Sequence, residues 1–234
     1  MSEEKAKGST AVVLSTVAGS VDVVGLGEIG RYDSHMTGTT THAMLRLVAG
    51  DERLVLFGLI AIACFLAGAT LAGAIIGPRG HSAWSRTAAI LIAIEAILIA
   101  VGGVFIVAFA PTHDSGMLVV GAFAMAMGVQ NTATTRLMSP FQRTTHVTSN
   151  LTDVGGTIGT ILRRGRRRIG GEDGNDKRDL AGPGLPIVGF AVGGLVGAIA
   201  VMVIERWSGL AAAGLPVLLT LWLAMRRGDA AVGG

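Results

Sequence analysis

Six apolar stretches, each near the length needed to cross a bilayer as a helix, constrain this chain more than any other feature. A hydrocarbon core about 30 Å thick requires about 20 helical residues. The stretches are Thr10–Ile29, Leu54–Gly77, Thr87–Ala110, Gly116–Thr135, Pro183–Ile204 and Ser208–Met225. Only 15% of the residues are charged, compared with about 25% in soluble domains. The sequence therefore predicts an all-α integral membrane protein with about six transmembrane helices.

The basic residues predict how these spans are oriented. If both termini and the loops after the second and fourth spans share one side, that side holds 15 of the 19 lysines and arginines. The positive-inside rule then places both termini in the cytoplasm, and we expect a multi-pass membrane protein. The expected units are a cytoplasmic tail (1–9), a three-span repeat (10–110), a second three-span repeat (111–225) with a basic cytoplasmic loop (163–182), and a cytoplasmic tail (226–234).

Two polar segments of similar sequence, called the polar phrases below, suggest an internal duplication. SHMTGTT occupies 34–40 and THVTSNLT occupies 145–152; each follows a span with a polar residue, Asp22 in the first and Asn131 in the fourth. FLAGATLAGAI (65–75) also resembles FAVGGLVGAI (190–199). Matches in the same order indicate a repeat. Because each copy has three spans, the second copy would enter the membrane from the opposite side.

Inverted repeats in transporters place the substrate near the bilayer midplane, at broken helices. We therefore expect broken or re-entrant polar segments after spans one and four, which together form one polar site at the repeat interface. The candidate substrate-binding residues are Asp22, His35, Thr37, Thr39, Asn131, His146, Thr148 and Asn150. Asn131 is preferred to its neighbour Gln130 because it matches Asp22 in the other copy.

Two carboxyl groups within the spans are candidates for proton coupling. Asp22 and Glu95 lie in the first and third spans, and an ionised carboxylate at the membrane centre costs about 2.5–3.5 kcal/mol on insertion scales. Such groups are therefore paired, protonated or turned toward a cavity. For Asp22, a structural carboxyl bonded to nearby hydroxyl groups is the alternative.

Other classes of site have little support in the sequence. The matched histidines lack further ligands, and there is no HExxH motif or cysteine cluster, so we expect no metal site and no cofactor. No nucleophile and base stand at a recognisable spacing, which argues against an enzyme. Basic residues gather in loops between spans, which does not indicate nucleic-acid binding.

Small residues repeat every four positions in two spans. They are Ala69, Gly73 and Gly77 in the second span and Gly189, Gly193 and Gly197 in the fifth. This spacing permits close helix crossing, and packing within the fold is the preferred interpretation. Homodimerisation through glycine-rich helix faces is the alternative. The other expected partners are membrane lipids and an unidentified small molecule or ion.

The polar phrases and the residues before them resemble one family. AGSVDVVG with SHMTGTT, and AMGVQNTATTR with RTTHVTSNLT, are similar to the YoaK-like bacterial membrane proteins over about Ala18–Met225. That family is a domain of unknown function, sometimes labelled as predicted permeases. The resemblance implies a protein of the bacterial inner membrane. This chain departs from its usual pattern at Thr39, where asparagine is usual, and at Ser149, where glycine is usual.

The sequence thus favours a small-molecule or ion permease of the secondary-transporter type. The alternatives are a membrane protein that binds or assembles without transporting, and a channel whose threonine-rich turns line a pore.

Overall fold

Helices make up nearly all of the structure. The computed structural model describes residues 3–30, 34–77, 84–109, 113–138, 144–165 and 176–232, and no strand occurs among them. The elements are α1 (Glu3–Ile29), α2 (Met36–Val48), α3 (Glu52–Ile76), α4 (Trp84–Ala108), α5 (His113–Ala133), the π-helix η2 (Thr134–Met138), α6 (Val147–Gly165), α7 (Asp176–Ile204), the 3₁₀ turn η3 (Glu205–Trp207) and α8 (Ser208–Val232).

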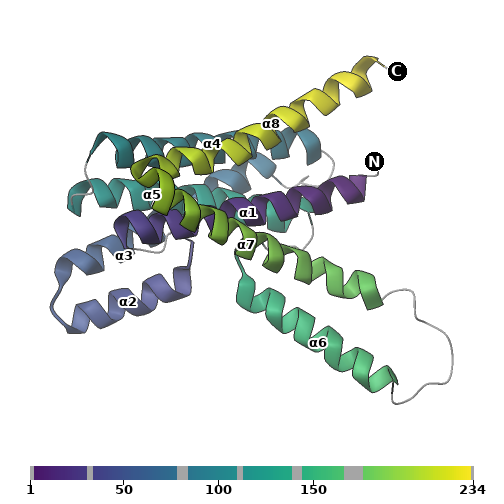
Figure 1. Ribbon diagram of the computed structural model, residues 1–234, viewed down its shortest axis with the longest axis horizontal. Helices are drawn as coiled ribbons and strands as arrows, with labels where there is room; N and C mark the ends of the chain where they lie inside the picture. Colours follow the sequence, from purple (N-terminus) through teal and green to yellow (C-terminus); the bar gives the residue numbers. More distant parts are fainter. Residues whose placement is uncertain are drawn as a thin grey trace.

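Five stretches of the described chain are long and apolar enough to cross a membrane. They are Lys7–Ile29, Glu52–Ile76, Arg86–Ala108, Gly116–Met138 and Leu180–Leu223. The last has 44 residues, which at about 1.5 Å per residue is about 66 Å, roughly twice the hydrocarbon thickness. It runs from within α7 through η3 into α8, a region that the sequence analysis divides into two spans. In Figure 1, α7 and α8 lead away from η3 toward the same end of the molecule.

The long helices pair across the two halves of the chain. α1 packs against α7, and α5 packs against α3, so the first helix of each half lies on a helix of the other half. α4 packs against α8 and α5, while the shorter helices α2 and α6 lie on α3 and α7 respectively. Each packing of α1, α2 and α3 thus has a counterpart among α5, α6 and α7, as a duplication predicts.

Glycines bring the paired helices close together at matching positions. A Cβ at Gly193 would overlap the carbonyl oxygen of Thr16, and a Cβ at Gly68 would overlap that of Met125. The neighbouring glycines make the same kind of contact. A Cβ at Gly19 would overlap the carbonyl oxygen of Phe190, and a Cβ at Gly128 would overlap that of Phe65. Small residues permit such backbone approach in membrane helices. These four contacts join residues at corresponding positions of the similar segments in the two halves of the chain.

The glycine ladder of α7 serves packing within the chain. Gly189, Gly193 and Gly197 lie against the backbone carbonyls of α1 at Val12, Thr16 and Ser20. In α3, by contrast, the atom nearest to a Cβ on Gly73 is Arg136 Nη1 at 3.9 Å, and Gly77 has nothing within 4 Å. The preferred interpretation of the ladder therefore holds for α7.

α1 and α5 run antiparallel. Leu14, in the first half of α1, shares a buried cluster with Val129 near the end of α5. Val21, further along α1, shares another cluster with Phe123, which comes earlier in α5. The end of α1 and the end of α5 therefore lie at opposite ends of their contact.

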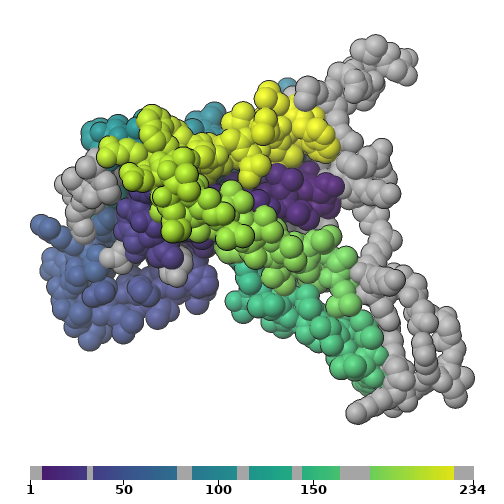
Figure 2. Space-filling model, viewed as in Figure 1, coloured from purple at the N-terminus to yellow at the C-terminus, as the bar shows by residue number. Residues whose placement is uncertain are grey.

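The polar phrases form the starts of α2 and α6. These two helices appear as separate arms below the main bundle (Figures 1 and 2). α6 ends at Gly165 and α7 begins at Asp176, so helix extends into both ends of the predicted loop 163–182. Residues 166–175 of that loop lie outside the described chain. The predicted tails are also largely helical, because α1 begins at Glu3 and α8 reaches Val232.

Candidate functional site

The first polar group joins the last part of α1 to the start of α2. Asp22 lies about two turns before the end of α1 and is 9% exposed. Its Oδ1 accepts hydrogen bonds from the backbone N–H of Ser34 at 3.2 Å and from Ser34 Oγ at 2.9 Å. α1 ends at Ile29, and the next residue, Gly30, has a φ of 73° in the left-handed region that glycine adopts without a steric penalty. The Asp22 carboxyl group is thereby held beside the residues that lead into α2.

The second polar group has the same connection at the end of α5. Asn131 is 8% exposed, and its Oδ1 accepts a hydrogen bond of 2.6 Å from Thr145 Oγ1. Thr145 stands two residues before α6, as Ser34 stands two residues before α2. The first turns also correspond: Thr39 N–H donates to the His35 carbonyl, and Asn150 N–H donates to the His146 carbonyl. In both halves, therefore, the same kind of hydrogen bond holds the chain where it turns back from a long helix into a shorter one.

Gln130 belongs to the second group, although the sequence analysis set it aside. It is fully buried, and its Nε2 donates to the Leu14 carbonyl of α1 at 2.9 Å and to Thr144 Oγ1 at 2.8 Å. Gln130 and Asn131 therefore bind two consecutive threonines. The sequence signal for Gln130 was the pair of threonines that precedes His146. At the corresponding place before His35, the first half has a single hydroxyl residue, Ser34.

The backbone around the second group departs from α-helical geometry. η2 follows α5 directly, and π-helical turns are frequent at functional sites. The hydroxyl of Thr134 donates to the carbonyls of Gln130 at 3.0 Å and Asn131 at 3.1 Å, and that of Thr135 donates to Asn131 at 2.7 Å. These bonds occupy the helix carbonyls next to the two amide side chains.

Several buried polar atoms in the described part of the chain have no hydrogen-bond partner. They include Gln130 Oε1, Asn131 Nδ2, Glu95 Oε1 and Thr10 Oγ1. Buried polar atoms without a partner are rare in native structures, and each calls for an explanation. Two of the four belong to adjacent residues of the second group, one of them an acceptor and the other a donor.

Glu95 lies in α4, 1% exposed. On the same face, Leu91 belongs to the buried cluster that contains Leu14, while Ile99 belongs to the cluster that contains Val17. Glu95 therefore stands between the two clusters along the bundle. No hydrogen bond from Asp22 or Asn131 to Glu95 occurs among the described contacts.

The remaining predicted residues lie nearer the surface, apart from Asn150, which is 1% exposed. His35, Thr37, His146 and Thr148 are exposed, and Thr39 is half-buried. Each of the two matched histidines therefore lies at the surface, directly after the hydroxyl residue that bonds Asp22 or Asn131.

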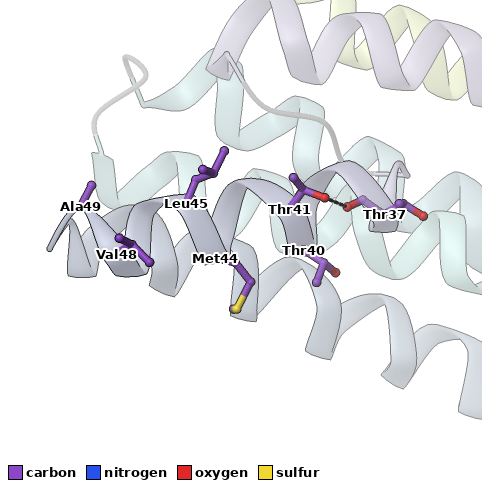
Figure 3. Close-up of a pocket in the computed structure, with 7 residues that line it drawn as sticks. All are labelled: Thr37, Thr40, Thr41, Met44, Leu45, Val48 and Ala49. Atoms are coloured by element: carbon purple, nitrogen blue, oxygen red, sulfur yellow. Dashed lines mark hydrogen bonds between the residues drawn. The ribbon is translucent and has the colours of Figure 1, made fainter.

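Thr37 contributes to a shallow surface groove of about 880 Å³ on α2. The groove is lined by Thr37, Thr40, Thr41, Met44, Leu45, Val48 and Ala49 (Figure 3). The hydroxyls of Thr40 and Thr41 donate to the carbonyls of Met36 and Thr37 within α2, at 2.8 and 3.0 Å. Six of the seven residues belong to α2 and Ala49 follows it directly, so the groove is an outer face of α2 and does not lie between the two halves of the chain.

The predicted residues come together as two groups. The Gln130–Leu14 bond places the second group beside the first half of α1. Asp22 follows Leu14 by eight residues, about 12 Å along a helix. Each half of the chain therefore has its own polar group. Within the described residues, no set of three or more His, Cys, Asp or Glu side chains is arranged to hold a metal ion.

Comparison with known proteins identifies relatives along most of the chain. Residues 10–224 match the family model named "Protein of unknown function (DUF1275)". The chain is 26% identical over 195 residues to the UPF0700 transmembrane protein YoaK of Bacillus subtilis (strain 168), and the alignment covers 80% of this chain and 81% of that relative. No solved structure matches the chain.

Proposed function

This chain belongs to the YoaK-like family of unknown function, DUF1275, and we propose that it is a permease for a small molecule or ion. It is a multi-pass membrane protein, and in this proposal it lies in a bacterial inner membrane with both termini in the cytoplasm. It acts as a secondary transporter and has no enzymatic activity.

The observation that carries the proposal is the pair of buried polar groups where α1 and α5 approach their ends. In the second group Gln130 Oε1 and Asn131 Nδ2 are enclosed and have no partner among the described residues. A buried polar atom that lacks a hydrogen bond costs about 1–3 kcal/mol. A bound substrate would supply the missing partners, and transporters bind substrates at such interruptions of membrane helices.

An inverted-repeat arrangement is part of the proposal. The exchanged packing of α1 on α7 and of α5 on α3 supports it, as do the matching glycine contacts. The turn at η3 supports counting α7 and α8 as two crossings, which gives six in all. With six crossings both termini lie on one side, in agreement with the basic residues near both ends of the chain.

Proton coupling is assigned to Glu95, with Asp22 as the second candidate. Glu95 Oε1 is buried without a described partner, and an ionised carboxylate there would be costly. A carboxyl group that must bind a proton whenever it is enclosed is suited to move that proton with a substrate. Asp22 already accepts two hydrogen bonds from Ser34, which makes it the weaker candidate.

A ligand screen followed by a flux assay tests the proposal. Purified full-length protein would be heated with a panel of metabolites and ions at two pH values. A ligand at a hundred times its Kd adds about 2.7 kcal/mol of stability, so a substrate is detectable. Each stabilising compound would then be tested for uptake into proteoliposomes. Asn131→Ala should lose both responses, and Gly214→Ala should keep both because a Cβ there meets nothing within 4 Å.

The outcomes separate the candidate functions. Stabilisation and uptake, both lost in Asn131→Ala, support the permease, and uptake that no longer follows a pH gradient in Glu95→Gln supports proton coupling. Binding without uptake would instead favour a non-transporting binding protein. Uptake that is not saturable at high substrate concentration would favour a channel.

A further inference from the structure

The two polar groups differ in charge at their central residue. In the first group a carboxylate, Asp22, accepts from the residue that stands two positions before α2. In the second group the neutral amide of Asn131 has that place before α6. The N-terminus of a helix carries about half a positive charge and favours an anion. Asp22 places an acidic side chain beside the approach to α2, and Asn131 places a neutral amide beside the approach to α6.

Two buried atoms of the second group, one donor and one acceptor, have no hydrogen-bond partner among the described residues. Asn131 is more than nine-tenths buried, and its Nδ2 donor has no partner in the described structure. Its amide is held at the approach to α6 by Thr145. Next to it, Gln130 Oε1 is a buried acceptor that also lacks a described partner. A ligand that reached both atoms would accept a hydrogen bond from Asn131 and donate one to Gln130.

The local sequence has opposite charge in the two halves. From Asp22 to His35 there are three acids (Asp22, Glu28 and Asp33) and one arginine, a net charge of −2. From Asn131 to His146 there are two arginines (Arg136 and Arg143) and no acid, a net charge of +2. The segment 131–146 thus lacks the acidic residues that the segment 22–35 contains.

We infer that the second polar group binds a small oxyanion that carries a hydroxyl group, such as dihydrogen phosphate or bicarbonate. One anionic oxygen accepts from Asn131 Nδ2 beside the start of α6, next to the amide that stands where the first half has the Asp22 carboxyl group. The hydroxyl group of the anion donates to Gln130 Oε1. The inference rests on the proposed permease and assigns an anionic class to its substrate.

The first test measures binding of inorganic phosphate to the purified full-length protein in detergent. The melting temperature would be measured in sodium phosphate near pH 6 and in sodium gluconate of equal ionic strength. At ten times Kd, phosphate should raise the melting temperature by about 3–6 °C. No rise with phosphate or with bicarbonate would overturn the inference.

Variants of the central residue then locate the site. Asn131→Asp places in the second half the carboxylate that the first half already has, and it should abolish the phosphate response. If that variant does not fold, Asn131→Ala removes the donor without adding charge and should also abolish the response. A full response in Asn131→Asp or Asn131→Ala would overturn the assignment.

Two further arms identify the source of the anion and separate this inference from the permease. A response to phosphate in lipid-free micelles indicates a free anion. A response in nanodiscs of phosphatidylglycerol, absent with phosphatidylcholine, indicates a lipid headgroup, and either must be lost in Asn131→Asp. Phosphate binding without flux in proteoliposomes would refute the permease alone. Flux of a neutral or cationic compound without phosphate binding would refute the inference alone.

Discussion

Replacing Gly193 by alanine should weaken the crossing of α1 and α7. A Cβ at this position would overlap the carbonyl oxygen of Thr16 and crowd the neighbouring backbone atoms of the same residue. Backbone atoms cannot rotate out of the way as the end of a long side chain can. The two helices would therefore have to separate along a contact that spans Gly189 to Gly197.

The magnitude follows from two opposing terms. Overpacking a well-packed interior typically costs about 1–3 kcal/mol, and the immobile carbonyl places this site at the upper end. Exchanging glycine for alanine within a helix returns up to about 1 kcal/mol. The net loss is about 2 kcal/mol, which corresponds to a fall of about 4–8 °C in melting temperature for a chain of this size.

Thermal unfolding of the purified protein in detergent measures this loss. Gly68→Ala should give a similar fall because Gly68 contacts the Met125 carbonyl at the matching position of the other repeat. Gly214→Ala is the control: nothing lies within 4 Å of its Cβ, so stability should stay equal or rise. If Gly193→Ala were as well tolerated as Gly214→Ala, the close crossing of α1 and α7 would be refuted.

Three further substitutions test other parts of the structure in the same unfolding assay. Gln130→Met removes the bonds to Leu14 and Thr144 and should cost about 1–3 kcal/mol; an unchanged melting temperature would contradict those bonds. Glu95→Gln should leave stability equal or higher, because Glu95 Oε1 has no described partner; a loss above about 1 kcal/mol would reveal one. Glu205, at the turn between α7 and α8, has a φ of 46°, so Glu205→Gly should stabilise by about 0.5–1 kcal/mol; destabilisation would show that its side chain contributes.

The sequence predicted the main helices because uncharged runs of this length have few alternatives to a membrane helix. It also predicted the correspondence of Asp22 with Asn131, since the phrases before α2 and α6 are similar. In the structure these residues indeed make equivalent bonds.

The partners of those residues were not predicted. Ser34 and Thr145 reach Asp22 and Asn131 because the chain folds back after α1 and α5. A segment that folds back in this way leaves no periodic pattern in the sequence. Gln130 was set aside by comparison with the first repeat, where valine stands at the matching position. Its contact with Leu14 depends on the antiparallel packing of α1 and α5, which only the folded chain specifies. The start of η2 likewise has no separate signal in the apolar pattern.

The most direct test of the proposed inverted-repeat permease is the side of the membrane on which equivalent residues lie. Glu52 and Arg163 are exposed residues at matching positions, just past α2 and near the end of α6. Each would be replaced by cysteine in a Cys64→Ser background and labelled with a membrane-impermeant maleimide in inside-out and right-side-out vesicles. The account predicts that Arg163→Cys is labelled from the cytoplasmic side and Glu52→Cys from the opposite side. Labelling of both from the same side would contradict the inverted repeats and the transport site built on them.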